Sequence, residues 1–207
     1  MNDITLFQKY MKKSGELPKY VSFDKYKELR GKVDGYYNRI NMPNKRQEFL
    51  KVRDRLFIDF MFATGGRIAD ILRVKKGNID FQTKQLTLDI KKTKRTIVIN
   101  IDEALAYDIS NYALENQLVD EDRLFKFTPT AGWYIIRKFG ALIGINELHP
   151  HMFRHGLALY LLSIGVPINV IQYRLGHSNI KTTIDMYLKV TPEIEKQIME
   201  TIGVQWR

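Results

Sequence analysis

The sequence contains no cysteine, which excludes disulfide bonds, cysteine-ligated metal sites and thiol catalysis. It also lacks a long hydrophobic run, since no stretch reaches the ~18 apolar residues that a membrane-spanning helix needs. Residues 1–14 are polar and basic and contain no apolar run of signal-peptide length. We therefore expect a soluble, cytoplasmic protein that carries no targeting segment and has no membrane partner.

Acidic residues are outnumbered: 23 Asp and Glu face 33 Lys and Arg, which gives a formal net charge of +10. Such a charge by itself is compatible with a well-solvated surface. The basic residues, however, gather in three segments, which contain Lys45, Arg46, Lys51, Arg53 and Arg55; Arg73, Lys75 and Lys76; and Lys91, Lys92, Lys94 and Arg95. None of these segments pairs its charge with an exposed Trp or Leu face, so the clustering favours nucleic acid over a membrane surface.

Hydrophobic periodicity predicts a mainly helical chain. Ser22 is a suitable N-cap for a first helix. Phe49, Val52, Leu56 and Phe60 form one buried apolar stripe in a second helix, which Gly65 and Gly66 end. The expected helices cover residues 22–40, 45–63, 68–74, 102–116, 130–143, 150–164, 167–175, 180–188 and 192–202. The length of 207 residues suits one domain that builds its core without disulfides.

The middle of the chain changes period. Residues 86–90 and 97–101 alternate apolar and polar side chains, which predicts two strands of an antiparallel hairpin. The hairpin turn would be the basic run at residues 92–95, and a third strand is expected near residues 78–81. The predicted fold class is therefore α+β, with a mainly helical domain and a small antiparallel sheet.

Three interpretations compete for His151, Arg154 and His155, which share one helical face at spacings of three and four. A zinc site is disfavoured because Arg154 would repel a cation. The histidines could instead be structural. In the third interpretation, Pro150 begins a helix whose free N–H groups, together with a bidentate arginine and a proton-moving imidazole, bind a phosphodiester. The carboxylate cluster of a metal-dependent nuclease is missing, because residues 120–122 form a polar loop run.

These residues also carry a family resemblance. Residues 151–155 (HMFRH), 175–177 (LGH) and 182–187 (TTIDMY) resemble the C-terminal signature of the tyrosine recombinases, the phage-type integrase family. Residues 64–72 (TGGRIADIL) resemble the segment that supplies the first arginine of the family. Lys92, in the predicted turn, stands where the catalytic lysine of the family is found. The resemblance extends over about residues 17–202 and implies the recombinase catalytic fold.

The resemblance implies a covalent reaction on DNA. Tyr187 would be the nucleophile that attacks a DNA phosphate and forms a 3′-phosphotyrosyl link. A phenol of pKa ~10 needs help at neutral pH, and His151 would act as its base or hydrogen-bonding partner. Lys92 would protonate the departing 5′-oxygen. Because the covalent link stores the bond energy, no ATP, metal ion or other cofactor is expected.

The same resemblance implies how the phosphate is held. Arg67 and Arg154 would clamp its non-bridging oxygens, and His177 would add a third donor. Asp70 would support Arg67 from behind. The six expected catalytic residues are therefore Arg67, Lys92, His151, Arg154, His177 and Tyr187.

The chain departs from the family pattern mildly at Gly66 and Phe153, where leucine is usual, and in the ten-residue spacing of His177 and Tyr187, which leaves delivery of the tyrosine in cis or in trans open. A larger departure is the N-terminus: we expect residues 1–16 to be a short extension and residues 17–207 the catalytic domain. The N-terminal core-binding domain of the family is apparently missing, so a separate core-binding or accessory protein is a candidate partner.

The expected function is site-specific recombination that integrates, excises or resolves a mobile element or replicon. The expected partners are double-stranded DNA and further copies of the chain in a tetramer, with residues 192–202 docked either on a neighbour or on their own domain. Type IB topoisomerase-like relaxation of DNA and a non-catalytic DNA-binding regulator on the same fold are the alternatives. In the family, the N-terminal domain forms the other half of a clamp around DNA. Without it, we also expect weak, salt-sensitive binding.

Overall fold

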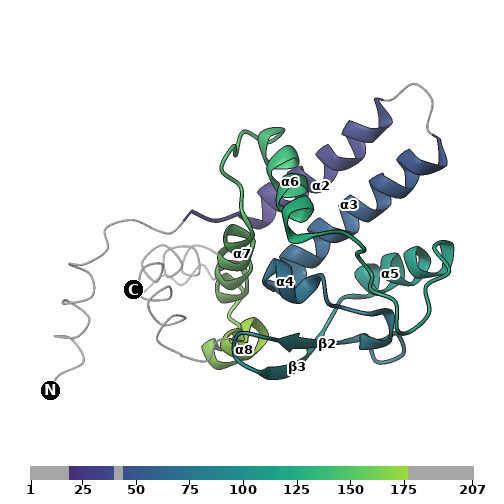
Figure 1. Ribbon diagram of the computed structural model, residues 1–207. Helices are drawn as coiled ribbons and strands as arrows, with labels where there is room; N and C mark the ends of the chain where they lie inside the picture. Colours follow the sequence, from purple (N-terminus) through teal and green to yellow (C-terminus); the bar gives the residue numbers. More distant parts are fainter. Residues whose placement is uncertain (1–18, 40–43, 177–207) are drawn as a thin grey trace, which may run out of the picture.

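The computed structural model describes residues 19–39 and 44–176. Helices dominate this part of the chain, and three short strands form a sheet beneath them (Figure 1). In chain order the elements are α2 (Phe23–Asn38), α3 (Lys45–Thr64), α4 (Ile68–Ile71), the 3₁₀ helix η1 (Lys76–Asn78), β1 (Ile79–Asp80), β2 (Gln85–Ile90), β3 (Arg95–Asn100), α5 (Glu103–Glu115), α6 (Pro129–Ala141), α7 (Pro150–Ser163) and α8 (Ile168–Leu175). The predicted fold class is confirmed.

Most expected elements appear with ends shifted by one or two residues, and Ser22 caps α2 by accepting a hydrogen bond from the Lys25 amide. The helices predicted at residues 180–188 and 192–202 lie outside the described residues. Within the described ranges, none of the helices is long and apolar enough to cross a membrane.

Two predicted elements between residues 68 and 81 are shorter than expected. The helix predicted for residues 68–74 ends at Ile71, and the backbone beyond it pairs instead with residues 122–124: the Lys76 amide donates to the Asp122 carbonyl and the Leu124 amide to the Val74 carbonyl. The strand predicted near residues 78–81 is only Ile79–Asp80. It stops because the Asp80 carboxylate accepts the next backbone amides and turns the chain.

Helix α3 is the centre of the molecule, with α7 on one side, α5 on the other and the strands below (Figure 1). The prediction of a single buried stripe was wrong here. Leu56 to Phe62 are buried on every side of the helix, whereas Phe49 is exposed. A helix covered on all sides by other elements needs no polar face, and its periodicity is then lost.

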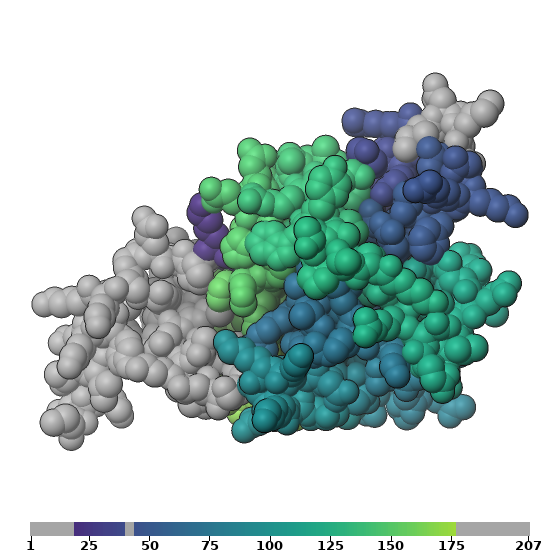
Figure 2. Space-filling model, in the orientation of Figure 1, coloured from purple at the N-terminus to yellow at the C-terminus, as the bar shows by residue number. Residues whose placement is uncertain are grey.

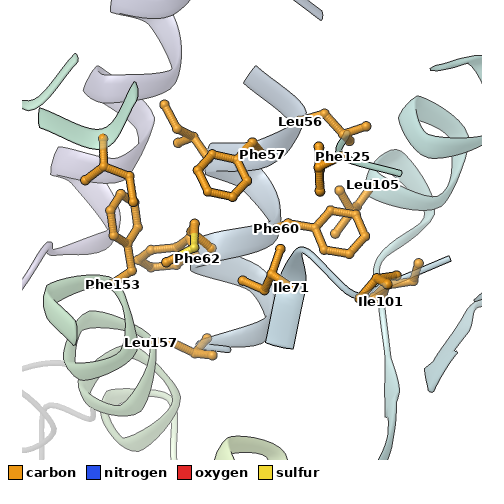
Figure 3. Close-up of a cluster of buried hydrophobic side chains, with 14 of the residues drawn as sticks. Leu56, Phe57, Phe60, Phe62, Ile71, Ile101, Leu105, Phe125, Phe153 and Leu157 are labelled. Atoms are coloured by element: carbon orange, nitrogen blue, oxygen red, sulfur yellow. The ribbon is translucent and has the colours of Figure 1, made fainter. Parts of the chain in front are cut away.

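The core joins α3 to α7 and to the loop before α6. Phe57 and Phe60 of α3 pack edge-on against Phe125, and Phe62 and Phe153 lie on the α7 side (Figure 3). Edge-to-face ring pairs stabilise by about 0.5–1.5 kcal/mol beyond the area that they bury. This packing fixes the end of α3 relative to the start of α7. Arg67 follows the end of α3, and Arg154 lies in the first turns of α7.

The sheet has the order β1-β2-β3 with both pairs antiparallel. In the predicted hairpin, Leu88 pairs with Ile97 and Ile90 with Arg95, so the turn is residues 91–94. Alternate side chains of β2 and β3 enter the core and the others face outward. In the space-filling view the teal strand region lies along the lower side of a continuous body of helices (Figure 2).

Candidate active site

Arg67 follows a sharp turn at the end of α3. Gly65 closes the helix at a φ of 56°, and the Thr64 hydroxyl donates to the Phe60 carbonyl while it accepts from the Gly66 amide. A side chain at position 65 would also collide with Leu175, because an added Cβ would lie 2.6 Å from its Cδ2 atom. Only glycine satisfies both conditions. The turn places Arg67 at the start of α4 in an extended backbone conformation.

The Arg67 guanidinium is partly buried and incompletely paired. Its Nη1 atom lies 3.8 Å from Asp70 Oδ2, which is an ion pair but too long for a hydrogen bond. This Nη1 atom is buried and has no hydrogen-bond acceptor among the described residues. A buried donor without an acceptor is costly and marks a place where a ligand oxygen would stabilise the protein.

Arg154 lies on the first turns of α7 with only 5% of its surface exposed. Its Nη1 atom donates to the Gly65 carbonyl at 2.8 Å and its Nη2 atom donates to the Leu175 carbonyl. These bonds tie together the end of α3, α7 and the end of α8. Burial, together with the charge of Arg67, lowers the pKa of Arg154 to about 10. The guanidinium therefore stays charged at neutral pH, next to a second cation.

His151 is exposed one helical turn before Arg154, which argues against a purely structural histidine. Its pKa is lowered from the ordinary value, first by partial burial and then by the charges of Arg154, His149, Arg67 and Lys92. The imidazole is therefore neutral at pH 7 and can accept a proton. The same influence indicates that Arg67, Lys92 and Arg154 lie near His151.

Lys92 is exposed in the β2–β3 turn, and α4 holds this turn in place. Asp70 Oδ1 accepts from the Lys91 amide at 3.3 Å and from Arg73 Nη2 at 2.5 Å. Arg73 Nη2 also donates to the Asp89 carbonyl at 2.9 Å. Asp70 therefore links Arg67 to the turn that contains Lys92. Its contact with Arg67 agrees with the role expected for it, and its contact with the turn is additional.

The structure thus brings four of the six expected catalytic residues together: Arg67, Lys92, His151 and Arg154. His177 and Tyr187 lie outside the described residues, so their places stay predictions. Among the described residues, no group of three His, Asp or Glu side chains could hold a metal ion. The cationic surroundings of His151 favour the phosphodiester interpretation.

Part of the predicted basic surface turns inward. Arg73 pairs with Asp70, Arg53 with Asp54 at 2.6 Å, and Arg55 with Asp108 at 3.4 Å. All three arginines belong to the basic segments that were expected to bind nucleic acid. In the structure they instead form ion pairs with carboxylates. For Arg73 and Arg53, an acidic residue three positions or one position away in the sequence was a signal for the ion pair. For Arg55, no such signal existed, because Asp108 is distant in the sequence.

Comparisons with known proteins identify the family of this chain. The model of the phage integrase family matches residues 37–193. The tyrosine recombinase XerA of Thermococcus onnurineus is 35% identical over 159 residues, which cover 72% of this chain and 55% of the relative. The chain thus spans about half the length of the curated relatives that it matches.

Two solved structures share the fold. The crystal structure of XerA recombinase has a TM-score of 0.72 at 22% identity, over 92% of this chain and 67% of that one. The crystal structure of XerH site-specific recombinase, bound to its difH substrate in a pre-cleavage complex, has a TM-score of 0.69 at 18% identity, over 86% and 52%. With the family model covering most of its residues, the chain belongs to the phage integrase family.

Proposed function

We propose that this chain is the catalytic domain of a site-specific DNA recombinase, which cleaves and rejoins strands through a 3′-phosphotyrosyl intermediate. The observation that carries the proposal is that contacts link Arg67, Arg154 and Lys92 on the His151 side of α7. Arg154 donates to the Gly65 carbonyl, two residues before Arg67, and Asp70 pairs with Arg67 and accepts from the Lys91 amide beside Lys92. The charges of all three also lower the pKa of His151. Three cations can bind the charged phosphodiester, and the neutral imidazole beside them can accept the proton of the attacking phenol. The similarity to tyrosine recombinases favours recombination over the topoisomerase and regulator alternatives.

In the proposed cleavage step, the phenolic oxygen of Tyr187 forms a bond to phosphorus as the bond from phosphorus to the 5′-oxygen breaks. The phenol proton passes to His151, which is neutral and can accept it. The electron pair of the broken bond goes to the 5′-oxygen, which takes a proton from Lys92. A 5′-hydroxyl from a second strand reverses these steps and releases Tyr187.

The arginines stabilise charge that builds on the non-bridging oxygens. Arg154 is held by two backbone carbonyls and cannot turn away, so little reorganisation is needed when the charge develops. Arg67 contributes a buried Nη1 donor without an acceptor among the described residues. His177 is proposed as a further donor from the family resemblance. The proposal needs no metal ion and no ATP.

The proposed partners are double-stranded DNA and further copies of the chain, as a tetramer, together with a core-binding or accessory protein. DNA as partner is supported by the XerH structure, in which that recombinase is bound to its difH substrate. The proposed setting is the integration, excision or resolution of a mobile element or replicon in the cytoplasm.

Covalent trapping tests the proposal. The protein is incubated with a duplex library of randomised core sequence, denatured, and the DNA that remains attached is sequenced to recover the cleaved site. We expect adducts joined through the 3′-phosphate to Tyr187, formed equally with or without a chelator. Tyr187→Phe should abolish them, whereas Tyr107→Phe, at an exposed tyrosine on α5, should not.

Adducts that persist in Tyr187→Phe would reassign the nucleophile. Strict dependence on magnesium would contradict the proposed chemistry. With a supercoiled plasmid that carries two recovered sites, exchange of DNA between the sites supports recombination, whereas relaxation without exchange would favour the topoisomerase alternative.

A further inference from the structure

The hairpin that carries Lys92 has an open edge. β3 is the last strand of the sheet, and beyond it no strand pairs with its backbone among the described residues. The outward N–H and C=O groups of such an edge are not bonded to a neighbouring strand, so on that side no ladder of hydrogen bonds fixes the position of β3. The position of the 91–94 turn at the hairpin tip therefore depends on what holds β3.

The last turn of α8 supplies partners for this edge. The Tyr173 hydroxyl accepts a hydrogen bond from the Val98 amide at 3.1 Å, and Arg174 Nη1 donates to the Asn100 carbonyl at 3.0 Å. Arg174 also reaches α3, where its Nη2 atom donates to the Ala63 carbonyl at 2.7 Å. One guanidinium thus joins β3 to the end of α3, two residues before the turn that leads to Arg67.

The backbone that follows packs directly on β2. Gly176 ends α8 with a φ of 60°, and a Cβ atom there would lie only 1.9 Å from Ile90 Cδ1. Ile90 is the last residue of β2, immediately before the turn that contains Lys92. The neighbouring Leu175 carbonyl accepts from Arg154. Residues 173–176 therefore contact both strands of the hairpin, α3 and a proposed catalytic arginine.

We propose that Tyr173 and Arg174 are positioning residues that hold the hairpin so that Lys92 can protonate the departing 5′-oxygen. They act through β3 and do not touch the reacting atoms. Asp70 of α4 and Arg73, just after this helix, hold the other side of the hairpin, so the turn is fixed between two supports. The inference rests on the proposed function, in which Lys92 is the general acid.

The leaving group makes the role of Lys92 measurable separately from general stability. An oxygen leaving group needs a proton as its bond to phosphorus breaks. A sulfur atom at the same bridging position leaves as a thiolate without one, since a thiol with a pKa of about 8.5 is far more acidic than a hydroxyl group. A residue that acts only through Lys92 therefore slows cleavage of the oxygen substrate and not of the sulfur substrate.

The test uses the full chain and two duplexes of the recovered cleavage sequence, one with oxygen and one with sulfur at the bridging 5′ position. We expect Tyr173→Phe to cleave the oxygen substrate about three to ten times more slowly, the range that one hydrogen bond is worth, and the sulfur substrate at the wild-type rate. Arg174→Lys should show the same pattern, and Lys92→Ala a stronger form of it. Tyr107→Phe, a change of the same chemistry on exposed α5, should leave both rates unchanged.

If the sulfur substrate restores cleavage by Lys92→Ala, the proposed function stands, and two results would then overturn the inference alone. One is an equal slowing of both substrates by Tyr173→Phe and Arg174→Lys, which indicates a general structural role. The other is no slowing of either substrate in both variants. If sulfur fails to rescue Lys92→Ala, the acid assignment of Lys92 in the proposed function is wrong, and the inference falls with it.

Discussion

Arg154 shows at the scale of one residue how the site is prepared before DNA binds. Its guanidinium is buried against backbone carbonyls from two distant segments, and it lies close enough to Arg67 for their charges to repel. Burying a cation is costly, and a second cation nearby adds to the cost. A phosphate offsets both, so the site gains most when the charge on the phosphate is largest.

Replacing Arg154 with lysine tests this arrangement. Lysine keeps the charge but loses the planar fork that holds two oxygens and two carbonyls. We expect Arg154→Lys to slow single-turnover cleavage by about 100-fold or more. The matched control is Arg137→Lys, because Arg137 is an exposed arginine that also donates to a backbone carbonyl, that of Asn146. Equal rates for the two variants would contradict the role of Arg154.

His151 predicts the pH dependence of cleavage. Its pKa is lowered, and the neutral form is the one that accepts the phenol proton, so activity is lost as the pH falls through that lowered pKa. We expect the rate to fall to half its maximum, on the acid side, at a pH below the ordinary imidazole value of about 6.5. His151→Gln should remove this acid limb and His149→Gln should keep it. A half-maximal rate at a pH above about 6.5 would contradict the assignment.

From the sequence, motifs identified the candidate site residues but not the residues that support them. Arg67, Lys92, His151 and Arg154 were found through motifs whose order and spacing a single chain can display. Arg174 carried no such signal. Whether an arginine faces water or holds a carbonyl depends on partners such as Asn100 and Ala63, which are distant in sequence and meet only in the folded chain.

At the scale of elements, the turn between α3 and α4 decides where Arg67 lies. Sequence reasoning identified the helix end at Gly65 because glycine adopts a left-handed conformation easily. It did not reveal that Leu157 and Leu175 close over that glycine. Likewise, the one-stripe pattern of α3 was misleading, because α3 is covered from more than one side by α2, α5 and α7.

Gly65→Ala separates conformational strain from crowding. Position 65 combines a positive φ with a close approach of Leu175, whereas Gly144 has a φ of 75° and open space around it. We expect Gly144→Ala to lower the free energy of unfolding by about 1–2 kcal/mol from strain, and Gly65→Ala to lower it by about 2–5 kcal/mol because crowding adds to strain. Urea denaturation measures both, and equal losses would argue against the packing at Gly65.

At the scale of the whole molecule, the count of 33 Lys and Arg residues overstates the positive charge that is available to DNA. Arg53, Arg55 and Arg73 are engaged with carboxylates of the same chain. The exposed cations that remain near the candidate site include Lys91, Lys92, Lys94 and Arg95 in and beside the hairpin turn. The sequence could count charges, but only the fold could sort them by partner.

This distribution predicts weak and salt-sensitive binding of the isolated chain to DNA. The logarithm of the binding constant should fall linearly with the logarithm of salt concentration, with a slope of about −0.9 for each phosphate contact. Fluorescence anisotropy with the recovered duplex across a salt series gives this slope. Nanomolar affinity of the monomer at physiological salt would refute the prediction.

The central claim is that the two arginines, Lys92 and His151 surround a single phosphate within reach of Tyr187. A crystal structure of Tyr187→Phe bound to the recovered duplex tests it most directly, because this variant keeps the ring but cannot cleave. We predict that the phosphate at the cleavage position accepts hydrogen bonds from both Arg67 and Arg154, with Lys92 facing its 5′-oxygen. A cleavage-site phosphate bound elsewhere on the protein, away from both guanidinium groups, would contradict the account.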